Sequence, residues 1–371
     1  MPPESWSGPP HAPTVLTVDL DAVAANWRLL AARAAPAATA AVVKADAYGL
    51  GIAPVARALA AAGTRSFFVA LLDEALALRA ALPEAEIFVL NGPAPGEVAD
   101  YRAARLVPVL NDPGQLSLWG NACRTSGPLP AAIQIDTGMS RLGFSPAETA
   151  ALSAEPARLD GIRIRCWMSH LACAETPDHP LNAQQRESFA RILTRLPAAP
   201  ACLANSSGIF LGAGWHFDMV RPGAALFGLA PTENAVNPMR QVIRLQARIL
   251  QVRDVDTPQT VGYGATHSVA GAARVATIAV GYADGYLRSL SGRGTAYAGE
   301  VALPVIGRVS MDLVTLDITT LPTLQPGDMV DVIGPCNPVD AVAAAAGTIG
   351  YEILTGLGRR YRRHYVGAGA A

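Results

Sequence analysis

A lysine stands where an apolar pair ends and a glycine-containing turn begins. In the segment VVKADAYGLG, Val42 and Val43 have the character of a strand end, and Gly49 and Gly51 favour a turn before the next helix. Lys44 would then lie at the carboxyl end of a strand, where α/β folds place their reactive groups. The structural alternative is a lysine that only reaches into solvent from a strand end.

Other polar residues end predicted strands or, for Arg221, lie within one, and they should converge on the same face. They are Asp136, His170, Asn205, Ser206 and Arg221. The segments NSSG (205–208) and RPGAA (221–225) offer backbone N–H groups at a helix start, which suits a bound phosphate. A phosphate site with a lysine across from it predicts pyridoxal phosphate held as a Schiff base on Lys44.

A repeated pattern between about residues 39 and 230 would position these groups. Short β-branched runs alternate with alanine-rich helical stretches such as DEALALRAAL (73–82). The runs occupy residues 39–46, 66–72, 86–91, 105–111, 131–136, 162–170, 201–206 and 219–228. Eight such units predict a parallel (β/α)8 barrel. A doubly wound open sheet is the alternative, but no GxGxxG follows the first run.

After about residue 240 the pattern changes to strand-like runs with little helix. They occupy residues 244–256, 273–286, 302–318 and 327–334. We therefore predict a disordered tail over 1–13, a barrel over 14–238 and a mostly antiparallel β domain over 239–371. Residues 14–20 are a candidate strand of that second domain.

Composition excludes several classes of protein. The 371-residue chain has a formal net charge of −1 and no long basic run, which argues against nucleic acid or an anionic membrane as a partner. No apolar stretch is long enough to predict a membrane span, and the N-terminus lacks a signal-peptide pattern. The five cysteines are scattered, which suits a reducing cytoplasm, and their spacing predicts no metal site.

Seven segments, in order, resemble the signatures of the alanine racemases, a family of fold-type III pyridoxal-phosphate enzymes. The resemblance extends from about residue 14 to 366. Its segments are VVKADAYGLG, DTGMSRLGF (136–144), RPGAALFG (221–228), VGYGATH (261–267), GYADGY (281–286), GRVSMD (307–312) and GYEILT (350–355). It implies a homodimer with shared active sites, in which the second domain contributes to the partner's site.

The resemblance also implies a role for each matching residue. Lys44 would carry the cofactor, and Tyr263 would be the second catalytic base, supplied by the partner subunit. Arg221 would face the pyridine nitrogen, His170 would link it to the tyrosine, and Arg141 would hold the substrate carboxylate. Further cofactor contacts are implied for Tyr48, Ser206, Gly223, Ala224 and Tyr351, with Asn205 beside them in the NSSG turn. Substrate or entrance contacts from the partner are implied for Tyr282, Met311 and Asp312.

The implied reaction is the interconversion of L- and D-alanine, for peptidoglycan or for alanine catabolism. Racemisation removes the α-proton from one face and returns a proton to the other, so two bases on opposite faces are required. An arginine at the pyridine nitrogen donates a hydrogen bond without giving up a proton, which disfavours transamination. The alternatives are a broader-specificity racemase, a decarboxylase of the same fold and a non-catalytic cofactor carrier.

Two positions depart from the family pattern. Leu50 replaces a histidine that often precedes the last glycine of the lysine signature. Gln134 replaces a lysine that is carbamylated in some members, seven residues before Arg141. A glutamine cannot be carbamylated; its neutral amide can bond Arg141 but supplies no negative charge, so a bound anion such as chloride is the candidate for that place. We therefore expect activity to be independent of bicarbonate.

Overall fold

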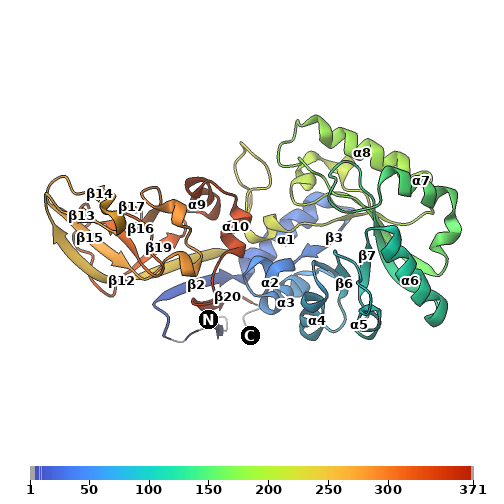
Figure 1. Ribbon diagram of the computed structural model, residues 1–371, viewed down its shortest axis with the longest axis horizontal. Helices are drawn as coiled ribbons and strands as arrows, with labels where there is room; N and C mark the ends of the chain where they lie inside the picture. Colours follow the sequence, from blue (N-terminus) through green and yellow to red (C-terminus); the bar gives the residue numbers. More distant parts are fainter. Residues whose placement is uncertain (1–4, 8, 10, 369–371) are drawn as a thin grey trace. The chain divides into compact units, whose positions relative to one another are not determined.

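The computed structural model of the chain describes residues 5–7, 9 and 11–368. The residues group into two compact units, which we call the barrel unit and the β unit (Figure 1). The barrel unit comprises Val23–Ala47 and Gly51–Met239. The β unit comprises Met1–Ala22, Tyr48–Leu50 and Arg240–Ala371.

The barrel unit contains a closed ring of parallel strands. Its strands are β3 (Ala38–Thr39), β4 (Ala41–Val42), β5 (Ser66–Val69), β6 (Glu86–Val89), β7 (Val107–Leu110), β8 (Leu129–Gln134), β9 (Ile162–Met168), β10 (Ala201–Cys202) and β11 (Met219–Val220). β3 pairs with β11 and β4 pairs with β5, while only Ala40 separates β3 from β4. The two short strands therefore share one position, and the predicted eight-position barrel is confirmed.

Helices follow most of these strands and lie outside the ring (Figure 1). They are α1 (Leu20–Ala34), α3 (Ile52–Ala62), α4 (Leu72–Ala81), α5 (Val98–Ala103), α6 (Pro113–Ser126), α7 (Pro146–Ala154) and α8 (Pro180–Leu193). Short 3-10 helices are η1 (Pro156–Leu159), η2 (Ser207–Leu211), η3 (Ala213–Trp215) and η4 (Ala224–Phe227). Because helices cover the ring, the strand residues are apolar on both faces, as in Phe67–Phe68 and Val107–Leu110.

The β unit is built on the long strand β12 (Ile243–Val255). The order β12-β15-β18-β17-β16-β19 returns to β12, so these strands close a second, antiparallel ring. The others are β15 (Ala273–Ile278), β16 (Thr295–Ala298), β17 (Val301–Ile306), β18 (Val314–Asp317) and β19 (Met329–Ile333). β2 (Thr14–Asp19) and β20 (Arg362–Val366) extend the sheet from β12, and they pair with each other in parallel. The predicted mostly antiparallel domain is confirmed.

Short elements complete the β unit. They are the hairpin strands β13 (Thr260–Val261) and β14 (His267–Ser268), the 3-10 helices η5 (Tyr263–Ala265), η6 (Tyr282–Asp284) and η7 (Arg288–Leu290), and the helices α9 (Val339–Ala346) and α10 (Gly350–Thr355). None of the helices in the described part of the chain is long and apolar enough to cross a membrane.

The N-terminal segment differs in part from the predicted disordered tail. Residues 1–4, 8 and 10 lie outside the described residues. Ser5–Ser7 form β1, which pairs antiparallel with β20. An outer strand such as β20 presents unpaired N–H and C=O groups to any neighbouring extended segment, and this explains the added strand.

Candidate active site

Lys44 opens a turn with an unusual backbone. It begins α2 (Lys44–Tyr48), just beyond β4, but residues 45–48 have φ values of 54° or 55° and are left-handed. This conformation costs about 1–2 kcal/mol for each residue other than glycine. Hydrogen bonds hold the turn at both ends: Ala47 N to Val43 O (2.9 Å), Gly51 N to Asp46 O (2.9 Å), Ile52 N to Asp46 Oδ1 (2.7 Å) and Ala45 N to Glu74 Oε1 (2.6 Å).

The surroundings of Lys44 favour its neutral amine. Burial lowers its pKa below the ordinary lysine value, and the positive charges of Arg141 and Arg221 lower the pKa further. The carboxylate of Glu74 raises it in opposition. Lys44 is also the only lysine among the 29 lysine and arginine residues of the chain. This composition signal singles out Lys44 and was available in the sequence.

Arg221 is a buried cation just beyond β11, with 4% of its surface exposed. Nη2 donates to Ser169 O at 2.5 Å and to Leu203 O at 3.3 Å, while Nε contacts Cys202 Sγ at 3.0 Å. Among the described residues no carboxylate forms an ion pair with it. A guanidinium buried among neutral acceptors retains its charge and can donate to an acceptor such as a pyridine nitrogen.

His170 lies next to Arg221 at the end of β9. Its Nδ1 is 3.5 Å from Nη1 of Arg221, at the outer limit of a hydrogen bond. Burial, followed by the charges of Arg221, Arg141 and Lys44, holds the pKa of His170 well below its ordinary value. The imidazole is therefore neutral at pH 7. Because Arg221 only donates, Nδ1 is the acceptor and Nε2 carries the proton.

The strand ends after β10 and β11 form a cradle of backbone donors. Ser206 Oγ accepts from Gly223 N at 2.9 Å and from Ala225 N at 3.2 Å, which joins the two strand ends. Asn205 Oδ1 accepts from Gly208 N at 2.9 Å and so closes the NSSG turn. Gly223 N and Ala225 N are engaged by Ser206, whereas Ala224 N between them has no acceptor among the described residues and remains a free donor at the start of η4. Together with Arg221 and the single lysine, this donor set fits pyridoxal phosphate.

Arg141 lies on an exposed loop whose shape is set by Asp136. The Asp136 carboxylate accepts from the backbone N–H groups of Gly138 (2.8 Å), Met139 (2.9 Å) and Ser140 (2.9 Å). The amide of Gln134 could bond Arg141, but the structure gives it another partner. Its Nε2 donates instead to Leu142 O at 3.0 Å, because Gln134 is buried beneath the loop and reaches the backbone first.

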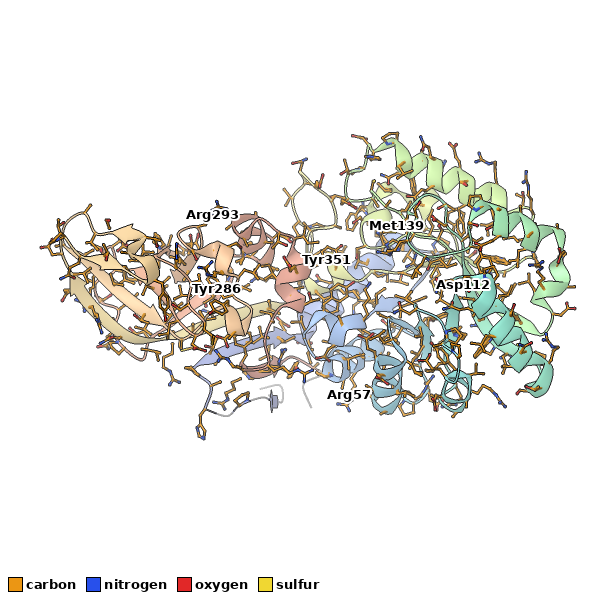
Figure 2. All side chains as sticks on the ribbon, viewed as in Figure 1. Arg57, Asp112, Met139, Tyr286, Arg293 and Tyr351 are labelled. Atoms are coloured by element: carbon orange, nitrogen blue, oxygen red, sulfur yellow. The ribbon has the colours of Figure 1, made fainter. Side chains whose placement is uncertain are left out.

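The β unit holds Tyr48 and Tyr351 close together. Their ring centroids are 6.2 Å apart, and Tyr351 lies on α10 (Figure 2). Tyr48 is buried; this burial, and then the proximity of Tyr351, raises its pKa above the ordinary tyrosine value. The phenol of Tyr48 therefore remains protonated at neutral pH and can donate a hydrogen bond to an anion.

The β unit also brings Tyr282, Met311 and Asp312 together. Tyr282 N donates to Ser310 O at 3.0 Å, so η6 is hydrogen-bonded to the loop that carries the other two. A Cβ added at Gly281 would lie 2.3 Å from Met311 O, so the close approach requires glycine. Asp312 pairs with Arg360 at 2.7 Å.

Tyr263 lies on η5 of the β unit and has 71% of its surface exposed. The flanking Gly262 and Gly264 have φ values of 79° and 71°, and a Cβ on either would lie within 3.2 Å of Arg308. The turn thus holds the tyrosine out into solvent. Tyr263 belongs to the β unit, whereas Lys44 belongs to the barrel unit.

The barrel unit brings Lys44, Arg141, His170 and Arg221 within electrostatic range of one another, and it joins Ser206 to Gly223. Glu74 was not predicted as a site residue from the sequence. It lies 30 positions beyond Lys44, in the stretch 73–82, whose pattern indicates only a helix. No cluster of three or more histidine, cysteine, aspartate or glutamate side chains suited to a metal occurs in the described part.

Comparisons with known proteins agree along most of the chain. The family model described as "Alanine racemase, N-terminal domain" matches residues 18–231, and "Alanine racemase, C-terminal domain" matches residues 242–365. The alanine racemase of Rhodospirillum rubrum is 51% identical over 96% of this chain and 97% of its own length. The catabolic alanine racemase of Agrobacterium fabrum is 51% identical over 95% and 92%.

A solved structure has the same fold. The alanine racemase of Bartonella henselae with covalently bound pyridoxal phosphate superimposes with a TM-score of 0.93 at 41% identity. The match covers 96% of this chain and all of that one. The chain therefore belongs to the alanine racemase family.

Proposed function

We propose that this protein is an alanine racemase that interconverts L- and D-alanine with pyridoxal phosphate. The observation that carries the proposal is the single lysine of the chain, held at a strand end with a lowered pKa beside Arg141 and Arg221. Family membership supports it, as does the related Bartonella enzyme, whose structure contains the cofactor covalently bound.

The residues that would hold the cofactor follow from the donors described above. Lys44 would bind the aldehyde carbon, and Arg221 would donate to the ring nitrogen. The cradle of Ser206, Gly223 and Ala224, with Asn205 beside it, would receive the phosphate, assisted by the phenols of Tyr48 and Tyr351. When bound, pyridoxal phosphate supplies a conjugated ring that acidifies the α-proton of the attached amino acid.

Lys44 would carry the proton on one face of the substrate. Its lowered pKa leaves more of the amine neutral near pH 7, which a general base requires. The guanidinium of Arg141 would hold the substrate carboxylate through a bidentate pair.

Tyr263 of the partner subunit would carry the proton on the opposite face. A free phenol, with a reference pKa near 10, is a weak acid for this task. His170, with Nδ1 engaged by Arg221, has its Nε2–H left to donate to the phenol oxygen, which would stabilise the phenolate. Arg221 would therefore act on both the cofactor and the second base.

We propose a homodimer because several large apolar side chains of the β unit are exposed in the single chain. Tyr263 and Met311 are 71% and 54% exposed, and Tyr282, Leu313 and Ile349 are also exposed. A second copy would cover them and receive Tyr263, Tyr282, Met311 and Asp312 at its own site. The five cysteines are all free, which supports a reducing compartment, the cytoplasm.

The test is incubation of the purified protein with L-alanine in deuterated water, followed by chiral analysis and NMR of the α-proton. Racemisation with α-deuteration is expected. Release of CO2 would instead indicate a decarboxylase, and no reaction would indicate a cofactor carrier. A panel of other amino acids tests for broader specificity.

Tyr263→Phe tests the second base. The change keeps the ring but removes the proton carrier, so racemisation should fall by roughly two orders of magnitude, the contribution of a general base. In deuterated water the variant should still exchange the α-proton of D-alanine through Lys44, while L-alanine remains nearly unlabelled. Equal residual exchange from both enantiomers would contradict the two-base assignment.

A further inference from the structure

We propose that Glu74 is a positioning residue for Lys44: its carboxylate ties the left-handed turn behind the lysine to the start of α4 and sets a negative charge against the lysine amine. The inference deepens the proposed function and rests on it for the role of Lys44. Its test uses measurements that do not require alanine turnover.

The first observation is the hydrogen-bond pattern of the Glu74 carboxylate. Oε1 accepts from Ala45 N at 2.6 Å, while Oε2 accepts from Ala70 N at 2.8 Å and from Leu71 N at 3.2 Å. Ala45 follows β4, and Ala70 and Leu71 follow β5, its neighbour in the ring. One side chain therefore fastens the carboxyl ends of two adjacent strands to each other.

The second observation is the strain of the segment that it holds. Residues 45–48 all have left-handed φ values, and none of them is glycine. Such a run persists only when its surroundings determine it. Glu74 bonds the first N–H of the run, directly after Lys44, while Asp46 Oδ1 bonds Ile52 N beyond its far end. Without Glu74 the near end of the turn would keep only the bond from Ala47 N to Val43 O, and the N–H directly after Lys44 would lose its acceptor.

The third observation is the charge around the amine. Arg141 and Arg221 both act on Lys44 in the same direction as burial, and Glu74 acts against them. His170, close by, is neutral at pH 7. Glu74 therefore limits how far the pKa of Lys44 falls below its ordinary value.

A helix cap is the competing account of Glu74. Its Oε2 bonds resemble those of a glutamate in the first turn of a helix, which satisfies free N–H groups there. Glu148 of α7 provides a matched control, because its Oε2 accepts from Ser145 N at 2.9 Å in the same first-turn arrangement. A cap alone would make substitutions of Glu74 and Glu148 equivalent.

The experiment compares Glu74→Ala, Glu74→Gln and Glu148→Ala in the full-length holoenzyme by hydrogen-exchange mass spectrometry. In Glu74→Ala, exchange in the segment 43–51 should rise roughly tenfold or more, the factor that matches loss of a charge-assisted hydrogen bond. Glu148→Ala should raise exchange only at the start of α7. Equal protection of segment 43–51 in Glu74→Ala and the parent would overturn the proposal.

A second readout separates charge from hydrogen bonding. After the cofactor is removed, acetic anhydride labelling of the single lysine is followed against pH, with peptide mapping to separate the N-terminal amine. Glu74→Gln keeps an acceptor for Ala45 but removes the charge, so the labelling midpoint of Lys44 should move to lower pH. An unchanged midpoint would contradict the electrostatic part. Because Glu74→Gln is nearly isosteric, it also carries the test if Glu74→Ala does not fold. Failure of the racemase assignment would leave both readouts intact.

Discussion

At the scale of single residues, the site depends on a lysine whose surroundings lower its pKa below the ordinary lysine value. Burial and two arginines lower the pKa of Lys44, so protonation costs more in the folded than in the unfolded chain. Lys44 was identified from the sequence by its strand-end position. The lowering of its pKa could not be predicted, because Arg141 and Arg221 lie about 100 and 180 positions away along the chain. Only closure of the strand ring brings them near the lysine.

We predict that Lys44→Met stabilises the cofactor-free protein at pH 7. A lowered lysine pKa means that the unfolded state binds more protons between that pKa and about 10.4, so the stability of the parent rises with pH in this window. Each unit of lowering is worth about 1.4 kcal/mol. The advantage of the variant should therefore shrink as the pH approaches 10.4.

Urea unfolding at several pH values measures this difference. Arg57→Met on α3 is the control, since Arg57 is an exposed cation (Figure 2). A Lys44→Met protein less stable than the parent at pH 7 would show that the lysine is held by favourable contacts instead.

Gln134 shows what the sequence could and could not predict about a departure from the family. The sequence shows that the carbamylation site is lost. It does not show that the Gln134 amide bonds Leu142 O, because that bond depends on how the loop folds back over the end of β8. Since Gln134 supports the Leu142 carbonyl and supplies no charge, alanine racemisation and its KM should be unchanged when bicarbonate is removed. A loss of activity that bicarbonate restores would refute this expectation.

At the scale of elements, the strand positions were predictable but their ends were not. The run at 219–228 was expected to be one strand, yet β11 ends at Val220 and η4 begins at Ala224. Pro222 has no N–H to donate to a ladder, so the strand cannot continue through it. This early ending frees the backbone around Gly223 for the donor cradle. The left-handed turn after Lys44 was also missed, since KADAY has ordinary helix-forming residues.

The loop that carries Arg141 provides a test at this scale. Asp136→Asn replaces one carboxylate oxygen by an NH2 group, which cannot accept all three backbone N–H bonds. The loop should loosen, and KM for alanine should rise roughly tenfold while kcat changes less, because Arg141 binds ground and transition states alike.

The matched control is Asp112→Asn. Asp112 caps α6 through Gln115 N at 2.9 Å and lies on a different loop from Met139 (Figure 2). Asparagine is as good a cap as aspartate, so this variant should keep the parent KM. An unchanged KM in Asp136→Asn would mean that the carboxylate does not set the position of Arg141.

At the scale of the whole molecule, the two units divide the proposed machinery between them. The barrel unit contains Lys44, Arg141, His170 and Arg221, and the β unit contains Tyr263. The sequence predicted this division from its change of pattern near residue 240. It did not predict that β12 returns to β19 and closes a second ring, because such long-range pairing has no local signal.

This division predicts complementation between two inactive proteins. Lys44→Ala lacks the residue that would hold the cofactor, and Tyr263→Phe lacks the second base, so each homodimer should be nearly inactive. In a mixed dimer, one site would combine the parent Lys44 of one subunit with the parent Tyr263 of the other. Random exchange of equal amounts gives half of the dimers as mixed, each with one of its two sites intact. The mixture should then recover about a quarter of the parent activity, in proportion to the intact sites.

Subunit exchange must be established independently, by native mass spectrometry of chains carrying tags of different mass. If mixed dimers form and activity does not return, the two residues do not meet across an interface, and Tyr263 would have to serve the site of its own chain. A double variant carrying both changes, mixed with the parent, separates these cases further. Each mixed dimer then has one site with the parent lysine opposite a variant tyrosine, and one with the reverse. A shared site therefore predicts no activity from such dimers, whereas a site within one chain predicts one active site in each.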